Sequence, residues 1–311
     1  RKMVEAARKF DVRVQVGFQA RSYKNINEAI KFLHDGGIGE VYMARGLCYK
    51  PRDSFGIAKD SVPPATLHYD QWLGPAQWRE YNEKRGHYNW HWHWNTGNGD
   101  SGNQGVHEFD IARWGLNKNE HPVSVYSTGG IYGIRSEECS QETPNTHSSV
   151  FRYEDGKILE FETRGRYFNR EGNLGVAIGN IFYGTEGYLE LQSWEKSGGE
   201  WQAFRKREKE PFAGSLIGES KQLAPTLMGP DSTNHFSNFI DAVRSGKNEM
   251  LNCDINEGFY SSALPHLGNI SYQLGRELKF MGDYERFAND PAADTMLSRN
   301  YRKPYVVPDE V

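Results

Sequence analysis

SSVFRYEDGKILEFETRG, residues 148–165, is the stretch that decides the fold. Apolar and polar residues alternate on both sides of its Asp155-Gly156 pair, and this is the period of a β-strand with one buried face. An Asp-Gly pair between two such runs is typical of a tight hairpin turn. The stretch therefore predicts two antiparallel strands, and IFYGTEGYLEL at 181–191 predicts a second pair across its Gly-Thr-Glu-Gly turn.

Other strands are expected before this β-rich middle, which extends over 123–192. VRVQVGF at 12–18 is apolar and β-branched, as buried strands are, and residues 41–49 predict another strand. The charged residues 195–212 predict a solvated excursion from the sheet.

Helical spacing of apolar residues occurs near both ends of the chain. A first helix is expected to begin at or before residue 1, and a second should follow a capping box of Asn25 and Glu28 and stop at Gly36-Gly37. Near the C-terminus, Phe236, Phe239, Ile240 and Val243 predict a helix that ends at Gly246, and Asp254 with Glu257 should cap another. The order of elements predicts an α/β beginning followed by an α+β fold.

Composition narrows the class of protein. The 311 residues carry a formal net charge of −4 with acids and bases mixed, which argues against a nucleic-acid partner. No apolar run approaches 18 residues, so no membrane span is expected. Three widely spaced cysteines form neither a disulfide framework nor a metal-binding pattern.

Residues 87–110, HYNWHWHWNTGNGDSGNQGVHEFD, are the candidate site. Ser101 and Gln104 have the spacing of a capping box, which predicts a helix from just after Ser101 to about residue 116. On that helix Asn103, His107 and Asp110 would share one stripe. The positive end of the helix dipole favours a neutral His107, the form that accepts a proton. The alternative is a structural histidine bonded to a carbonyl group.

The His-Trp alternation has two interpretations. If the segment is extended, His91 and His93 share one face, and Trp90, Trp92 and Trp94 the other. The two histidines with His107 could then bind a metal ion. We favour tryptophan faces that stack on a sugar, with no metal, because no carboxylate or cysteine lies at metal-ligand spacing.

Several motifs together resemble the glucose–fructose oxidoreductase/inositol dehydrogenase (Gfo/Idh/MocA) family, in its bacterial branch with the GNQGVH motif. The resemblance covers nearly the whole chain, with these motifs in the family's order: GGIGEVYMARG, YDQWLGPA, HYNWHWHWNTGNGDSGNQGVHEFDIARWGL, ETPNTHSSVFRYEDG, IFYGTEGYLEL and HFSNFIDAVRSGK followed by LNCDINEGFYSSALPHLGNISYQLGREL.

The resemblance implies a Rossmann domain that binds NAD or NADP, followed by a large open antiparallel β-sheet flanked by helices. Residues 1–22 would be the C-terminal remnant of the Rossmann sheet, with Gln19 and Arg21 near the cofactor. Residues 23–311 would form the substrate domain, which makes a homo-oligomer through the open sheet. The resemblance leaves the compartment open between the bacterial cytoplasm and periplasm, because any export signal would precede residue 1.

The resemblance also assigns roles at the site. His107 would act as acid and base on a hydroxyl of a sugar or polyol. The carboxylate usual four positions earlier is replaced by Asn103, so Asp100 or Asp110 would substitute for it. The residues expected to hold the substrate are Tyr88, Trp90, His91, Trp92, His93, Trp94, His147 and Arg164.

Two family features are missing from these residues. No G-x-G-x-x-G motif follows a predicted strand, and the Glu-Lys-Pro motif with the family's active-site lysine is absent. Two alternatives to an oxidoreductase therefore stay open. One is an enzyme that cleaves glycosides by transient oxidation and elimination, with His147 or Tyr88 as the further base. The other is a carbohydrate-binding or assembly module without catalysis.

Overall fold

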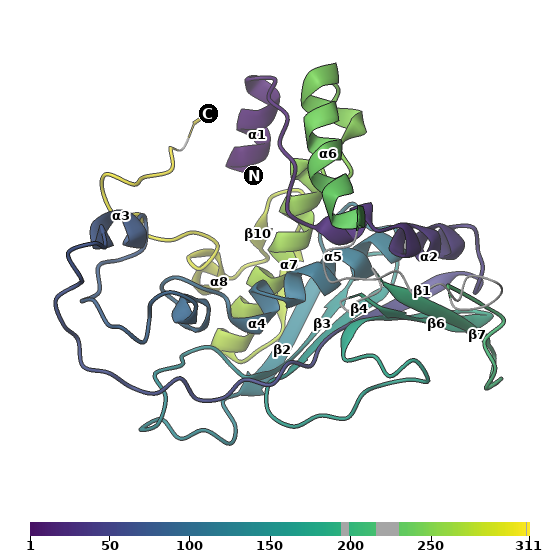
Figure 1. The fold of residues 1–311 in the computed structure, drawn as a ribbon, viewed down its shortest axis with the longest axis horizontal. Coiled ribbons are helices and arrows are strands. Elements are labelled where there is room, and N and C mark those ends of the chain that lie inside the picture. The colour runs from purple at the N-terminus through teal and green to yellow at the C-terminus, as the bar shows by residue number, and fades with distance from the viewer. Residues whose placement is uncertain (194–198, 216–229, 309) are drawn as a thin grey trace.

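The computed structural model describes residues 1–193, 199–215, 230–308 and 310–311. Figure 1 labels most of the elements along the chain. The helices are α1 (Lys2–Lys9), η1 (Gln19–Ser22), α2 (Lys24–His34), α3 (Tyr69–Leu73), η2 (Asn89–Trp92), α4 (Gly99–Gly102), α5 (Gly105–Gly115), α6 (Pro230–Ser245), η3 (Asn248–Met250), α7 (Ile255–Leu274) and α8 (Pro291–Asp294). The strands are β1 (Val41–Cys48), β2 (Ser124–Gly130), β3 (Thr146–Arg152), β4 (Ile158–Arg164), β5 (Ile178–Gly184), β6 (Gly187–Gln192), β7 (Glu200–Arg205), β8 (Ala213–Gly214), β9 (Leu278–Met281) and β10 (Arg286–Phe287).

A ten-stranded sheet is the scaffold of the described part of the chain, in the order β10-β9-β2-β3-β4-β1-β5-β6-β7-β8. The hairpin predicted for 148–165 is confirmed as β3 and β4, and the pair predicted for 181–191 as β5 and β6. Strand β1 lies in the middle, parallel to β4 and antiparallel to β5. The other described pairs are antiparallel, so the expected large open sheet is confirmed.

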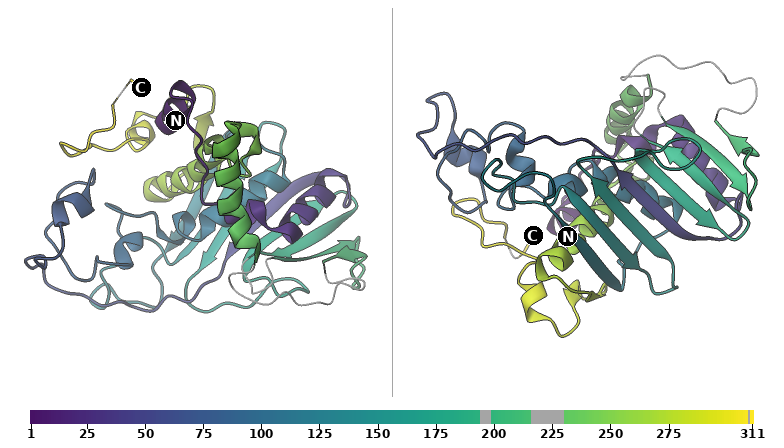
Figure 2. Two further views of the ribbon diagram at one scale, coloured as in Figure 1. Left: turned by 45° about the horizontal axis from the view of Figure 1, so that its top comes forward. Right: turned by 90° about the horizontal axis from the view of Figure 1, so that it is seen from below.

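Helices α2, α5 and α7 lie on one face of this sheet (Figure 1), and the right panel of Figure 2 shows strands of the other face without a helix across them. Phe109 of α5 packs against Phe151 of β3 and Phe161 of β4, with ring centroids 5.5 and 4.3 Å apart. All three side chains are buried. The main core therefore lies between α5 and the centre of the sheet.

Helix α5 approaches the sheet closely because its first and last residues are glycines. A Cβ added to Gly105 would lie 2.3 Å from Cζ of Phe161, and one added to Gly115 would lie 2.2 Å from Cε1 of Phe182. Neither ring could move far inside a packed core. The two glycines thus set the distance between the helix and the strands.

Buried ion pairs connect η1, α5 and α7. Asp110 accepts hydrogen bonds from Nε and Nη2 of Arg21 at 2.8 and 2.9 Å and from the Ser261 hydroxyl at 2.6 Å. Glu257 of α7 accepts from both Arg21 and Arg113. Buried charges are stable only when paired in this way, so the three elements are held in one arrangement.

Two expected elements differ from the structure. Residues 12–18 do not form a strand: Val12 is exposed, and Gln15 forms only an isolated bridge to Asp254. A strand needs a neighbour, and no other described segment pairs with this one.

In the charged stretch 195–212, residues 195–198 lie outside the described part, whereas 200–205 form β7 with Trp201 buried. The polar residues of β7 alternate with buried ones, which explains the wrong prediction.

The helices predicted near the two ends of the chain are present, but not all of their predicted capping interactions form. The Asn25 side chain donates to the carbonyl of Gly199 instead of capping α2. Asp254 does cap α7, since it accepts from the backbone N–H of Asn256 at 3.0 Å, but Glu257 turns to the arginines. Helix α6 ends before Gly246 as predicted. Among the described residues, none of the helices is both long and apolar enough to span a bilayer.

Replacing Asp110 tests the buried ion pairs. Asp110→Asn should lower the free energy of unfolding by about 3–5 kcal/mol, because it leaves the Arg21 charge buried without its main partner. Asp35→Asn removes an exposed carboxylate paired with Lys31 and should cost about 0.5 kcal/mol or less. Urea denaturation of both variants measures the difference. Equal, small losses would contradict a structural role for the network.

Candidate functional site

The predicted helix from Ser101 to residue 116 is broken at Asn103, so that prediction is wrong at its beginning. Helix α4 ends at Gly102, Asn103 has φ −83° and ψ −85°, and α5 begins at Gly105. The Ser101 hydroxyl donates to the carbonyl of Asn98 at 3.1 Å and is not an N-cap. Asn103 therefore lies at a bend before the helix that carries His107, and not on one stripe with it.

His107 lies half-buried in the first turns of α5, with its ring edge-on to Phe18 at 5.7 Å between centroids. Burial lowers the pKa of His107, the Lys50 cation lowers it further, and Asp110 opposes the shift. The imidazole is then neutral near pH 7 and able to accept a proton. This agrees with the expected state of His107, although burial and not the helix dipole is the main cause.

A chain of polar groups leads from Lys50 into the core beside His107. Nζ of Lys50 lies 3.5 Å from Oε1 of Gln104, and Nε2 of Gln104 lies 3.4 Å from Oε1 of Glu108. The Ser193 hydroxyl donates to the same Glu108 oxygen at 2.9 Å. Burial raises the pKa of Glu108 to about 8, so this carboxyl group is mainly protonated at neutral pH.

Arg52 supplies a second cation on the same side of the sheet. Its guanidinium pairs with both oxygens of Asp100 at 3.1 and 2.7 Å and lies 4.8 Å from the Trp92 ring. Sequence reasoning missed Lys50 and Arg52. The sequence did contain a signal for them. In an extended chain, side chains two and four residues after Cys48 point to the same face as Cys48, which is the face covered by the helices, and Lys50 and Arg52 hold those positions.

The tryptophans do not form one wall. Residues 89–92 are a 3₁₀ turn, so the extended segment that would separate histidines from tryptophans is absent. Trp90 stacks on His91 with centroids 3.8 Å apart, Trp92 is buried under Arg52, and Trp94 lines a cavity beside α7. Tyr88 is 51% exposed next to Trp92 and remains accessible to a ligand.

Three further predicted residues are not brought to His107. His93 and His147 are each 1% exposed, and burial lowers the pKa of His147 to about 4. Arg164 lies on the helix-free face, paired with Glu162 at 2.6 Å. In β4 the odd-numbered residues, such as Phe161, face the helices. Arg164 is even-numbered and points to the opposite face, so it cannot belong to a site beside α5.

The proposed replacements for the missing carboxylate are already bound to arginines. Asp110 is fully buried under Arg21, and Asp100 is 2% exposed and holds Arg52. Neither can reach a substrate in this arrangement, so Asp110 acts on His107 through its charge. Arg21 is likewise occupied, with Asp110 and Glu257, while Gln19 lies half-buried at the start of η1.

The residues present do not fit a dinucleotide phosphate site. GNGDSG at 97–102 has G-x-G-x-x-G spacing, but it follows the turn η2 and not a strand. A Cβ on Gly97 would lie 2.3 Å from the carbonyl oxygen of His91, so this glycine serves the packing of the turn. The described residues also bring no three histidine, cysteine or acidic side chains together as metal ligands.

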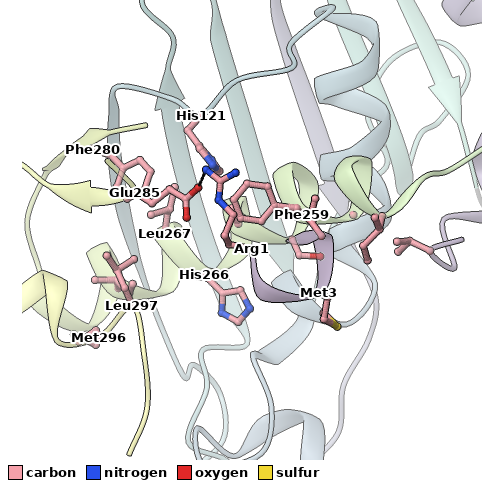
Figure 3. Close-up of a pocket in the computed structure, with 17 residues that line it drawn as sticks. Arg1, Met3, His121, Phe259, His266, Leu267, Phe280, Glu285, Met296 and Leu297 are labelled. Carbon is pink, nitrogen blue, oxygen red and sulfur yellow. Dashed lines mark ion pairs between the residues drawn. The ribbon is translucent and has the colours of Figure 1, made fainter. Parts of the chain in front are cut away.

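Two cavities adjoin α7. One, of about 460 Å³, is mainly apolar and lies beneath α1, where Arg1 pairs with Glu285 near His121 (Figure 3). The other, of about 850 Å³, is lined by amide side chains and by Trp94. His266 belongs to the lining of both.

Comparison with known proteins identifies the family. The family model described as "Oxidoreductase family, C-terminal alpha/beta domain", of the Gfo/Idh/MocA group, matches residues 52–168 and 214–307. The chain belongs to this family, as its motifs indicated. A search of curated proteins finds no match.

Solved structures share the fold at low sequence identity. Aldose-aldose oxidoreductase from Caulobacter crescentus, complexed with glycerol, is 15% identical with a TM-score of 0.59, over 89% of this chain and 67% of that one. Levoglucosan dehydrogenase, with NADH and levoglucosan, is 14% identical with a TM-score of 0.58, over 86% and 67%. WlbA dehydrogenase from Bordetella pertussis, with NADH and UDP-GlcNAcA, is 16% identical with a TM-score of 0.55, over 90% and 67%.

Replacing Lys50 tests its effect on His107. Lys50→Met should raise the pKa of His107, because the neighbouring cation now disfavours the imidazolium ion. An NMR titration of the His107 ring measures this without any substrate. Lys59→Met, at an exposed position, is the control and should leave the titration unchanged. An unshifted His107 titration in Lys50→Met would rule out the electrostatic contact.

The Glu108 carboxyl group predicts a pH-dependent stability. Because its folded-state pKa of about 8 exceeds the usual value near 4.3, the unfolded chain loses this proton first as pH rises. The contribution of Glu108 to stability therefore falls between these two pH values, by up to about 1.4 kcal/mol per pH unit. Glu108→Gln should gain stability relative to the parent between pH 6 and 8 in urea denaturation. The exposed Glu249→Gln should keep the parental slope, and a parental slope in Glu108→Gln would contradict the assignment.

Proposed function

We propose that this chain forms the substrate-binding part of an NAD(P)-dependent oxidoreductase that acts on a hydroxyl group of a sugar or polyol. His107 is the acid and base. The observation that carries the proposal is a neutral, half-buried imidazole at the start of α5 in a chain of this oxidoreductase family. The relatives with glycerol or levoglucosan support the substrate class.

The chain's own residues account for the proton transfer. His107 accepts the proton of the reacting hydroxyl group, which requires the neutral ring that burial and Lys50 maintain. Lys50 also provides a positive charge beside the oxygen that loses the proton. Asn103, at the bend, contributes a donor and an acceptor that position the hydroxyl group but cannot take up its proton.

We propose that NAD or NADP supplies the redox chemistry from a site that these residues do not form. Residues 1–22 are the end of the dinucleotide-binding domain, and 23–311 are the substrate domain. Support comes from the relatives solved with NADH. A homo-oligomer through the open sheet is supported by Tyr42, Tyr126 and Val150, which are 48%, 47% and 40% exposed.

A second candidate is a carbohydrate-binding module without catalysis, favoured by the lack of a phosphate-binding loop in the described residues. The glycoside-cleaving alternative has less support. One of its two candidate bases, His147, is buried beneath Tyr272, which leaves only Tyr88.

Binding of NAD(P)H to the protein, measured by calorimetry, separates these candidates. With the dinucleotide-binding part of the protein present, we expect binding, and oxidation of a sugar or polyol that falls about 100-fold or more in His107→Ala with sugar affinity retained. Gln71→Ala on α3, an exposed residue, is the control. Sugar binding without any NAD(P)H binding would replace the proposal with the binding module.

A further inference from the structure

The cavity of about 850 Å³ lies outside the His107 site and has walls from four separate parts of the chain. Trp94, Asn95 and Asn98 come from the segment before α4, and His266 to Gln273 from α7. Residues 295–301 form the opposite wall, and Gln77 completes the rim. Neither His107, Lys50 nor Arg52 lines it. Its volume is in the range of small-molecule sites.

The walls of this cavity are fixed by hydrogen bonds between those parts. Asn269, 4% exposed, donates to the carbonyl of Asn98 at 3.1 Å and accepts from the Ser101 hydroxyl at 3.3 Å. Arg302 donates to the carbonyl of Gly74 at 2.8 Å and also contacts Asp70. The segment 295–301 is thus held in place, and a ligand would meet a preformed site.

The lining is suited to hydroxyl groups. Asn95, Asn98, Gln273 and Asn300 bring amides, each with donors and acceptors, to one cavity. Trp94 is held by its backbone N–H, which donates to Glu142 at 2.8 Å, and its ring offers an apolar face. Donors and acceptors around an aromatic face match a sugar ring, which carries hydroxyl groups at its edge and C–H groups on its faces.

The charge of the cavity indicates the kind of saccharide. Arg299 donates from Nη1 to the carbonyl of Asn95 at 3.3 Å and forms no ion pair within the described part of the chain. No aspartate or glutamate is among the described lining residues. An arginine that keeps free N–H groups in such surroundings favours a carboxylate, which its planar fork can bind at two points.

His266 adds a polar group without a protein partner. Its ring extends from the α7 ribbon in Figure 3, is exposed to solvent, and makes no hydrogen bond within the described residues. Solvent reaches the ring through the two cavities that it lines, but the protein atoms packed around it partly desolvate it. This desolvation and the nearby Arg299 lower the pKa of His266, so the ring is neutral near pH 7 and can both donate and accept.

We propose that this cavity binds a saccharide that carries a carboxylate, with Arg299 on the carboxylate, Trp94 against the ring and the amides on the hydroxyl groups. The site is separate from His107 and does not rest on the proposed oxidoreductase function. Its described lining residues include no aspartate or glutamate, the pair that most glycoside-cleaving sites use, so we assign it binding and not cleavage.

Calorimetry with defined oligosaccharides tests the proposal. The probes are oligogalacturonates and oligoglucuronates of two and three units, each compared with its methyl ester, which keeps the size and removes the charge. We expect acids to bind about 10-fold or more tightly than their esters. Arg299→Met should abolish this preference, and Trp94→Ala should weaken both forms. Arg244→Met, at an exposed arginine of α6, is the matched control and should change neither affinity.

Each other outcome overturns the proposal. Equal binding of acids and esters, or a preference that survives Arg299→Met, would reject the carboxylate site. Absence of binding for every probe to the folded parent would reject a saccharide site. His107→Ala should retain all of these affinities, so a failure of the oxidoreductase proposal remains distinguishable from a failure of this one. Circular dichroism of Trp94→Ala and Arg299→Met establishes that both variants are folded.

Discussion

The close approach of α5 to the sheet is the constraint on which the rest of the structure depends. Gly105 and Gly115 leave no side chain between the helix and the rings of Phe161 and Phe182. At this distance Glu108 is buried against the strands, and the residue before it, His107, packs against Phe18. The same contact therefore creates both the core and the candidate site.

Electrostatics near His107 follow from how the buried charges are paired. The carboxylates on α4 and α5 are each matched by an arginine from another element, Asp100 by Arg52 and Asp110 by Arg21. Paired in this way, Asp110 still raises the pKa of His107, but desolvation lowers it by more, and Lys50 adds to the lowering. The neutral histidine is thus mainly a result of burial.

Much of the fold was predictable because its signals are local. The Asp155-Gly156 turn with alternation on both sides specified β3 and β4, and Asp254 specified the start of α7. The strand expected at 12–18 needed a neighbour that local sequence does not reveal. At the candidate site, His107 was predicted from its helical context, and the structure places it on α5. Arg164 was misplaced because the sequence does not say which face of a strand the helices cover.

Strand β1 has a consequence for how the chain folds. Residues 41–48 pair with β4 and β5, which follow in sequence only at 158–164 and 178–184. At ribosomal rates of about 5–20 residues per second, β1 waits on the order of 10 s for its partners. The centre of the sheet can close only after a long loop is ordered, so folding should be slow compared with that of hairpin-connected sheets. During that interval the apolar strand is the segment most exposed to aggregation.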